Sequence, residues 1–432
     1  MERERPHLSF AGGSLKIGGI PARILSEKYG TPLYVTDLDR VGQRYEAANT
    51  ALSSRYRNIL VAFAYKSNST RDVVNLLSRK CAGATVVSMF GLELAIASGV
   101  EAHNIIFDGP SKTKEELAAA LRAGVGMINA ESIQEVEDIE SLCAHMHVKS
   151  CKLGFRINFD LHADTHAGLA TGGSGHKFGI AREEVVQFCK TKAPRLKRVR
   201  LAGLHCHVGS QINNPAPFRK LTEEMVALGD ELEQEGIEIH EFNLGGGLAA
   251  HYGWERRLEF DEYAEATAGT FARLRGDRRS KDLRLVFELG RSIIADSTVL
   301  LTRVNYVKRV GGRWWALVDA GMNDFLRPSL YGAFHAIVPA YVGRQEPSNV
   351  AYNIGGPVCE STDVFGTDRK LGLRLSPGDV LAVLDTGAYG VSMASHYNMR
   401  PVPPVVVVSR GMHRLALPDM RYPLRRPPGL ET

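Results

Sequence analysis

Residues able to do chemistry recur at one kind of place in this sequence, the end of a short apolar segment. The segment Leu60–Tyr65 is rich in strand-forming residues, and Lys66 follows it directly, ahead of small polar residues. An amine held at such a place and shielded from water could form a Schiff base with a carbonyl cofactor. A surface lysine at a strand end is the ordinary alternative.

Similar apolar segments elsewhere also finish in polar or glycine residues. In chain order these are Ser88, Asp108, Asn129, Arg156 with Asn158, His205 with His207, the triplet Gly245, Gly246 and Gly247, and Glu288. The strands that would precede them are predicted over residues 59–65, 85–88, 104–108, 126–129, 152–157, 200–207, 240–244 and 283–288. Helical patterns lie between them at 71–80, 115–123, 132–143, 183–190, 218–234 and 260–275. Such alternation predicts a (β/α)8 TIM-type barrel, whose active site lies where its strands end.

After about residue 300 the pattern changes to short strands punctuated by proline and glycine, which predicts an all-β domain. The N-terminal strands are expected to join it, so the fold class is α/β with an added β domain. We predict four regions: residues 1–38 as N-terminal strands of the β domain, 39–300 as the barrel, 301–420 as the C-terminal β domain, and 421–432 as a disordered tail. The loop 161–177, rich in Gly, His and Thr, is long and polar enough to be functional.

The amino-acid composition is typical of a globular protein and argues against several other classes. The 432 residues are 44% hydrophobic and 23% charged with a net charge of +5, which is ordinary for a globular protein. No apolar stretch reaches the roughly 20 residues of a membrane span, and the charged N-terminus lacks a signal pattern, so we expect a cytoplasmic protein. The six cysteines form no Cys-x-x-Cys pair, which argues against a zinc ribbon or a disulfide framework. No nucleic-acid signature is present.

Two of the strand ends suggest how a phosphorylated aromatic cofactor could be held. Gly245, Gly246 and Gly247 follow the seventh strand, where barrels commonly bind phosphate through backbone N–H groups. Glu288 and Arg291 follow the eighth strand. They could pair with each other at the rim, or Glu288 could keep a pyridine nitrogen protonated and so make the ring an electron sink.

Other candidates are scattered along the chain. His205 and His207 are predicted to share one strand face, where His207 could stack on a flat cofactor; a zinc site is not expected because no third ligand has metal spacing. Cys359 and Glu360 stand together in a polar loop, which is not a core pattern. Arg327 and Tyr331 would share a face if their segment is helical, and an arginine there suits a carboxylate. Tyr389 has glycine neighbours and so room to reach a ligand.

Taken together, these motifs resemble the barrel-type pyridoxal-phosphate (PLP) amino-acid decarboxylases, most closely the diaminopimelate branch. The resemblance runs from Leu33–Val35 to Asn398–Pro401. It implies conversion of meso-diaminopimelate to L-lysine and carbon dioxide by a homodimer with shared active sites. The roles it implies are Lys66 as the Schiff-base lysine, His207 on the cofactor ring, Glu288 on the pyridine nitrogen, and Ser210, Gly245, Gly246, Gly247, Arg291 and Tyr389 around the phosphate. The substrate would be bound by Arg291, Arg327, Tyr331, Glu360 and Tyr389. Cys359 would act near the reacting carbon. Both Cys359 and Glu360 would come from the partner subunit.

Three positions depart from the family pattern. Thr85 stands where an Asp is usual, Gly91 where a Glu is common, and Leu289 where a Pro is usual. The first two changes leave the substrate open, so a related decarboxylase acting on ornithine, arginine or another amino acid stays an alternative. A racemase, a Schiff-base aldolase and a non-catalytic PLP-binding regulatory relative are further alternatives. Within and just after the loop 161–177, His166–Gly172 and Lys177–Gly179 match the family's active-site loop and suggest a lid.

Overall fold

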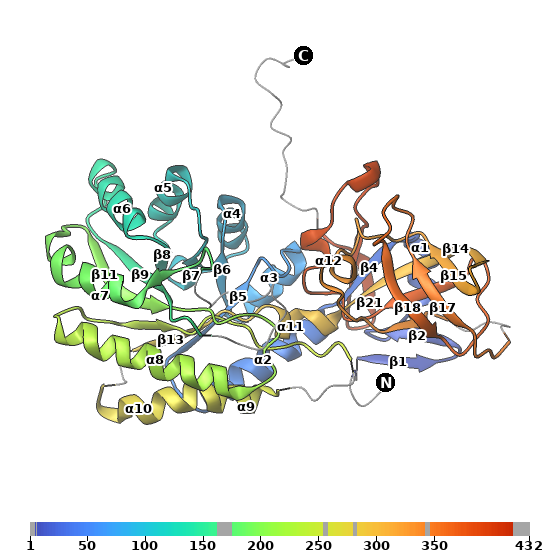
Figure 1. The fold of residues 1–432 in the computed structure, drawn as a ribbon, viewed down its shortest axis with the longest axis horizontal. Helices are drawn as coiled ribbons and strands as arrows, with labels where there is room; N and C mark the ends of the chain where they lie inside the picture. The colour runs from blue at the N-terminus through green and yellow to red at the C-terminus, as the bar shows by residue number, and fades with distance from the viewer. Residues whose placement is uncertain are drawn as a thin grey trace, which may run out of the picture.

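The computed structural model describes Arg5 and residues 7–161, 175–253, 258–279, 283–341 and 346–417, which form a barrel and a β domain side by side (Figure 1). The predicted lid loop falls mostly on residues 162–174, and the predicted tail on 421–432, so both lie outside the described residues. No helix within the described residues combines the length and apolar character needed to cross a membrane. The domain limits stated above stay predictions.

Parallel strands form the barrel, and all eight predicted strands are present within the described residues. They are β5 (Ile59–Ala64), β6 (Gly83–Val86), β7 (Ile105–Phe107), β8 (Met127–Ala130), β9 (Cys151–Asn158), β11 (Val199–His205), β12 (Glu241–Asn243) and β13 (Arg284–Phe287). Pairing runs in the order β9, β11, β12, β13, β5, β6, β7 and β8, and β8 pairs back with β9, which closes the barrel. The short β10 (Ile180–Ala181) extends the sheet beside β9. The barrel prediction is therefore confirmed.

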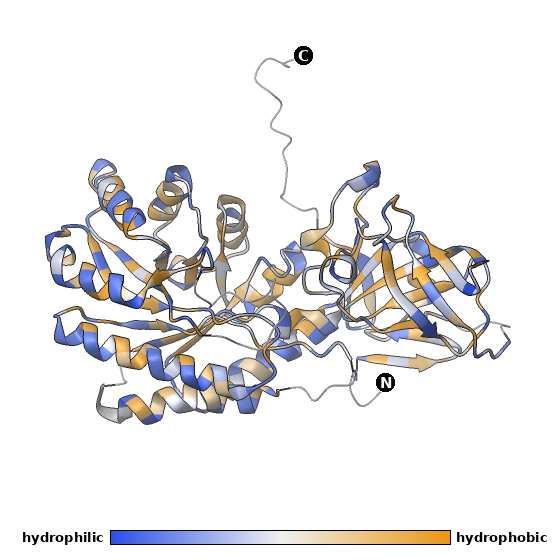
Figure 2. Cartoon of the chain, viewed as in Figure 1, coloured by the Kyte–Doolittle hydropathy of each residue, from blue (hydrophilic) through white to orange (hydrophobic). Residues whose placement is uncertain are grey.

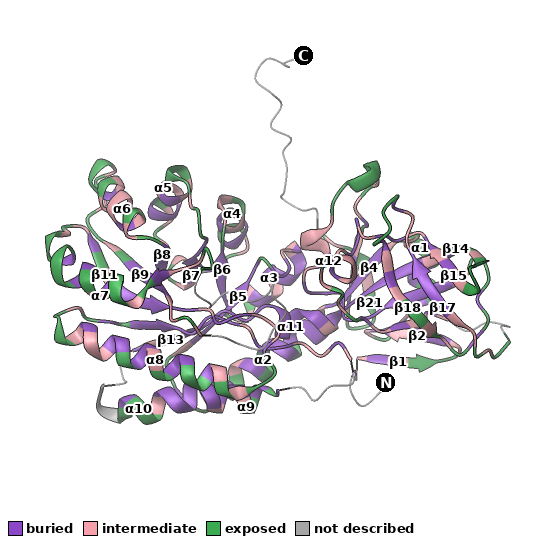
Figure 3. Cartoon of the chain, in the orientation of Figure 1, coloured by how far each residue is buried: buried purple, intermediate pink, exposed green. Residues whose placement is uncertain are grey.

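Helices surround the barrel because each presents one apolar face to the strands. They are α2 (Leu38–Ser53), α3 (Arg71–Arg79), α4 (Met89–Ala97), α5 (Lys114–Ala123), α6 (Ile133–His145), α7 (Arg182–Thr191), α8 (Pro215–Gln234), α9 (Phe260–Ala264), a π-helical turn (Glu265–Gly269) and α10 (Thr270–Arg279). The outward faces of most of these helices are hydrophilic and exposed, and the strands behind them are apolar and buried (Figures 2 and 3). The helix α4 differs, since Phe90 and Ile96 are apolar side chains on its exposed surface. Local signals agree with this arrangement: Thr113 and Glu116 form a reciprocal capping box that starts α5.

The β domain contains both ends of the described chain, as predicted. Its sheet has the strands β4 (Leu33–Asp37), β14 (Thr298–Val310), β15 (Arg313–Val318), β16 (Ile337–Pro339), β17 (Ala351–Gly355), β18 (Val364–Lys370), β19 (Val380–Val383), β20 (Val405–Ser409) and β21 (Met412–Leu415). The N-terminal β4 lies between β14 and β20. A separate small sheet of β1 (Leu8–Ala11), β2 (Ser14–Ile17) and β3 (Ile20–Pro21), with α1 (Ala22–Tyr29), packs apolar side chains into the same core.

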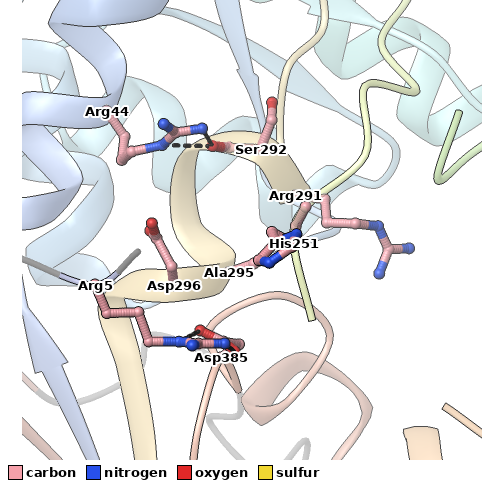
Figure 4. Close-up of a pocket in the computed structure, with 9 residues that line it drawn as sticks. Arg5, Arg44, His251, Arg291, Ser292, Ala295, Asp296 and Asp385 are labelled. Atoms are coloured by element: carbon pink, nitrogen blue, oxygen red, sulfur yellow. Dashed lines mark hydrogen bonds and ion pairs between the residues drawn. The ribbon is translucent and has the colours of Figure 1, made fainter. Parts of the chain in front are cut away.

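A buried polar cluster, called the joint below, lies where the barrel and the β domain meet (Figure 4). Arg5 donates two hydrogen bonds to the carboxylate of Asp385 in the β domain, at 3.0 and 2.5 Å, and both side chains are buried. Arg44, on α2 of the barrel, donates to the carbonyl of Ser292 at 2.9 and 3.1 Å. Ser292 belongs to α11 (Arg291–Ile294), the short helix between β13 and the β domain. The N-terminal segment thus fastens the loop that leads to Tyr389.

Removal of the Arg5 guanidinium should destabilise this joint strongly, because it leaves the buried Asp385 carboxylate unpaired. We expect Arg5→Met to lower the free energy of unfolding by about 3 kcal/mol, measured by urea unfolding. Adding Asp385→Asn to that variant should recover part of the loss. The exposed pair Arg23–Glu27 offers a control, since Arg23→Met should leave the free energy of unfolding nearly unchanged. An Arg5 effect no larger than the Arg23 effect would contradict the role of the joint.

Candidate active site

The carboxyl ends of the barrel strands open into a cavity of about 370 Å3. Of the residues predicted from the sequence to form the site, those that line it are Lys66, His207, Ser210, Gly247, Glu288, Arg291, Tyr331 and Tyr389. Gly245 and Gly246 lie in the adjoining turn, and Arg327 is packed behind the cavity wall. Cys359 and Glu360 do not line it and are exposed. One cavity therefore gathers most of the predicted site.

Lys66 follows β5 at a sharp turn of the chain. The turn is held by the Ser67 hydroxyl, which donates to the carbonyl of Ala64 at 2.7 Å, and by the Asn68 amide, which donates to the carbonyl of Gly387 at 2.9 Å. Lys66 is exposed and borders a second, adjacent cavity of about 310 Å3. The expectation of a desolvated amine is thus not met within a single chain, because no described residue covers the lysine.

Glu288 lies at the floor of the cavity and is 5% exposed. Its carboxylate accepts a hydrogen bond from the Asn243 amide at 2.7 Å. The ring of His205, which is fully enclosed, lies between two carboxylates: Nε2 is 3.6 Å from Glu288, and Nδ1 is 3.9 Å from Asp108. No ion pair joins Glu288 to Arg291 among the described residues, so the rim salt bridge considered above is not what holds this carboxylate.

Glu288, Asp108 and His205 shift one another's pKa values. Burial alone would raise the pKa of Glu288, but the charge of His205 and that of Lys66 reverse this and bring it below its usual range. Burial, aided by the negative charge of Glu288, raises the pKa of Asp108 to about 6. Burial acts to lower the pKa of His205, and the two carboxylates outweigh it and raise that pKa. Glu288 is therefore anionic, as a partner of a protonated ring nitrogen must be.

The same three side chains could also offer ligand atoms to a metal ion, since these atoms lie within 4.8 Å of one another. A protonated His205 supplies the compensating positive charge without an ion. The sequence predicted that His205 and His207 share one strand face. The structure groups His205 with the two carboxylates instead, because β11 ends at His205 and His207 lies in the following loop.

His207 is fixed by the glycine turn. Its Nδ1 accepts a hydrogen bond from the N–H of Gly246 at 3.1 Å. Burial, with the nearby charges of Lys66 and Arg156, lowers its pKa well below the usual value. The ring is thus neutral and flat at the cavity wall, which suits stacking on an aromatic ligand. A Cβ on Gly246 would come within 2.2 Å of the Glu288 carbonyl, so close packing requires this glycine independently of any phosphate.

Two buried arginines lie near one another without an acidic partner among the described residues. Arg291 donates to the Tyr252 hydroxyl at 3.1 Å and lies over the Tyr389 ring at 4.6 Å. Arg327 lies over the Tyr252 ring at 4.4 Å. It begins α12 (Arg327–Tyr331), so the segment that carries Arg327 and Tyr331 is helical. Buried cations without a carboxylate are costly unless an anion joins them, which indicates an anionic ligand.

Tyr389 reaches the cavity from the β domain. Its backbone has φ of 58°, and its N–H donates to the carbonyl of Ser67 at 2.8 Å. This bond ties the tyrosine to the turn that carries Lys66. The site is therefore built jointly by the barrel and the β domain.

Glu131 is a structural participant that sequence analysis did not identify. Its carboxylate pairs with Arg156 at 2.6 Å and accepts the N–H of Gly179 at 2.8 Å. Arg156 in turn lies over the Phe178 ring at 4.5 Å. Glu131 thus anchors the segment that directly follows the loop 161–177, where Phe178 and Arg156 line the cavity. Its place directly after β8, two residues beyond the fourth predicted strand, was the available signal.

The three positions that depart from the family pattern, Thr85, Gly91 and Leu289, all lie in the barrel. Thr85 is buried on β6, and its hydroxyl has no hydrogen-bond partner among the described residues. Gly91 donates its N–H to the Ser88 hydroxyl at the start of α4. Leu289 is buried, and its carbonyl accepts the N–H of Ala64. None of the three supplies a charge to the cavity.

Comparison with known proteins agrees with this geometry. Residues 38–295 match the model of the family described as pyridoxal-dependent decarboxylase, pyridoxal binding domain. The chain is 38% identical to a diaminopimelate decarboxylase from Pseudomonas aeruginosa over 392 residues, which is 91% of each chain. It is similar to the crystal structure of the diaminopimelate decarboxylase of M. jannaschii in co-complex with L-lysine, with a TM-score of 0.88, 35% identity and 95% of each chain covered. The corresponding Helicobacter pylori enzyme complexed with L-lysine has a TM-score of 0.84 and 32% identity, covering 91% of this chain and 95% of that one.

The raised pKa of Asp108 has a consequence for stability. Because the folded state binds this proton more tightly than the unfolded state, stability falls as pH rises from about 4 to about 6. We expect Asp108→Asn to change little at pH 4 and to increase the free energy of unfolding at pH 7 by about 1–2 kcal/mol. Urea unfolding at both pH values measures this. Asp368→Asn, at an exposed position, serves as control, and equal effects of Asp108→Asn at the two pH values would refute the assignment.

Proposed function

The chain belongs to the pyridoxal-dependent decarboxylases, among the diaminopimelate decarboxylases, and we propose from this that it binds PLP in the barrel cavity and converts meso-diaminopimelate to L-lysine and carbon dioxide. One observation carries the assignment to this cavity: Lys66, His207, Glu288 and Arg291 all line it. Together they offer an amine, a neutral flat ring, an anionic carboxylate and a cation, which are the groups that PLP requires.

The residues present fit the cofactor. Lys66 would hold its aldehyde carbon, His207 would stack on the ring, and Glu288 would accept the hydrogen bond of the protonated ring nitrogen. Ser210, Arg291, Tyr389 and the turn Gly245–Gly247 would surround its phosphate. When bound, PLP supplies the electron sink that takes up the electron pair left as carbon dioxide departs. Asn243 and His205 keep Glu288 oriented and anionic for this purpose.

The far end of the substrate would meet the arginines. Arg291 and Arg327 are buried cations without an acidic partner among the described residues, and Tyr331 lines the cavity beside them. An amino acid whose non-reacting end keeps a carboxylate supplies the missing anion. Meso-diaminopimelate has such an end, and lysine retains it after decarboxylation.

Cys359 and Glu360 would come from the partner subunit of a homodimer. Both are exposed on a β-domain loop, where the Cys359 N–H donates to the Asn398 side chain and Glu360 accepts from the Tyr397 hydroxyl. Lys66 is exposed on the same chain, so a partner loop would cover it. Cys359 would then stand where the carbon that loses carbon dioxide receives its proton.

The first test is turnover. PLP-loaded protein should release carbon dioxide and L-lysine in equal amounts from meso-diaminopimelate, and Lys66→Ala should reduce the rate at least about a thousandfold. The exposed Lys149→Ala serves as the matched control and should leave the rate unchanged. Bound cofactor without release from this substrate would point to another amino acid, or to a regulatory relative if a panel of amino acids also fails.

A mixing experiment tests the shared site. Lys66→Ala and Cys359→Ala should each be nearly inactive alone. After dissociation and random reassociation, half of the dimers should carry one intact site, which restores about a quarter of the wild-type activity. A mixture no more active than its components would refute a site built from two subunits.

A further inference from the structure

The guanidinium of Arg327 has an unusual partner. The residue is 3% exposed, and its only side-chain hydrogen bond among the described residues goes from Nη1 to Nε2 of His335, at 2.7 Å. His335 follows α12 in the chain and is fully enclosed. A histidine therefore occupies the place where a buried arginine ordinarily has a carboxylate.

The two partners of His335 fix its tautomer. The carbonyl of Leu384 can only accept, so Nδ1, at 2.9 Å from it, must carry the proton. A guanidinium can only donate, so Nε2 must present its lone pair to Arg327. Burial lowers the pKa of His335 well below its usual value, and the charged groups around it, Arg327, Arg291 and Arg369, are all cations that lower it further. The ring is neutral.

Packing holds this ring in one place. Phe325 meets it edge-on with centroids 4.6 Å apart, and Tyr252 meets it at 4.7 Å. Tyr252 also stacks on Arg327 and accepts a hydrogen bond from Arg291. His335 and Tyr252 together therefore set the direction of both guanidinium groups.

A neutral acceptor has a different effect from a carboxylate. Asp or Glu at this position would pair with Arg327, neutralise it and compete with an incoming anion. A neutral imidazole orients the guanidinium and leaves its charge uncompensated. The cost of that buried charge is offset only when a ligand carboxylate arrives, so ligands without one gain nothing from the arrangement.

We propose that His335 is a positioning residue for substrate selection: it aims Arg327 and preserves its positive charge for the carboxylate at the non-reacting end of the substrate. The inference rests on the proposed function, and it identifies which neighbour makes that arginine selective. His335 itself does not touch the reacting atoms.

Two substitutions separate the two hydrogen bonds of the ring. His335→Gln can place a carbonyl oxygen near the position of Nε2 and so keep the acceptor for Arg327. His335→Asn mimics the Nδ1 side, keeps the donor to Leu384 and removes the acceptor. The probes are lysine and cadaverine, which differ only by the carboxylate, titrated into PLP-loaded protein and followed by the visible absorbance of the bound cofactor.

We expect His335→Asn to weaken lysine binding about tenfold and to change cadaverine binding less than about twofold, while His335→Gln retains most of the lysine affinity. Equal weakening of both probes would indicate a merely structural role and overturn the proposal, as would unchanged lysine binding. A wild-type protein that does not prefer lysine to cadaverine would instead refute the proposed function itself.

Should His335→Asn not fold, the wild-type protein still provides a test. Nitrogen NMR of 15N-histidine-labelled protein should show His335 neutral, with the proton on Nδ1, from pH 6 to pH 9. A protonated ring, or a proton on Nε2, would overturn the proposal, because neither form can accept from Arg327.

Discussion

The buried carboxylate of Glu288 is the charge on which the site depends. At the floor of a barrel an isolated carboxylate would take up a proton, and a neutral acid could not pair with a protonated ring nitrogen. Asn243 and His205 prevent this, one by a hydrogen bond and the other by its positive charge. Asp108, on the other side of the imidazole, also favours the protonated form of His205 when it is itself ionised. Burial and the charge of Glu288 raise the pKa of Asp108 to about 6. The catalytic end of the barrel is thus a set of coupled protonation states rather than a set of independent groups.

The opposite problem arises where the barrel meets the β domain. There the buried charges are cations, Arg291 and Arg327, and the neighbours that hold them are neutral: Tyr252, Tyr389 and His335. The positive charge of these arginines is therefore left for an anionic ligand to neutralise. Glu288 and Arg291 line the same cavity, and Arg327 lies behind its wall. This arrangement of charge orients a ligand that has a cationic ring nitrogen at one end and anionic groups at the other.

The sequence alone predicted much of the site because a barrel converts a local pattern into a spatial one. Each apolar strand ends in a polar residue, and closure of the sheet brings these ends together whatever the lengths between them. Lys66, His207 and Glu288 could be named in this way. Glu131 and His335 were not named: Glu131 stands two residues beyond the fourth predicted strand, and no local pattern marks His335. The expected desolvation of Lys66 was also not met within one chain, because no described residue covers it.

The sequence by itself determined the order of strands and helices, the ring of polar strand ends and the family, because these depend on periodicity and on residue types at fixed spacing. Only the tertiary structure decided which charges are compensated. His205 lies between Asp108 and Glu288, and Arg327 donates to a neutral His335, through contacts between segments whose packing no local pattern specifies. Protonation depends on burial and on neighbours a few ångströms away, and both exist only once the chain has folded.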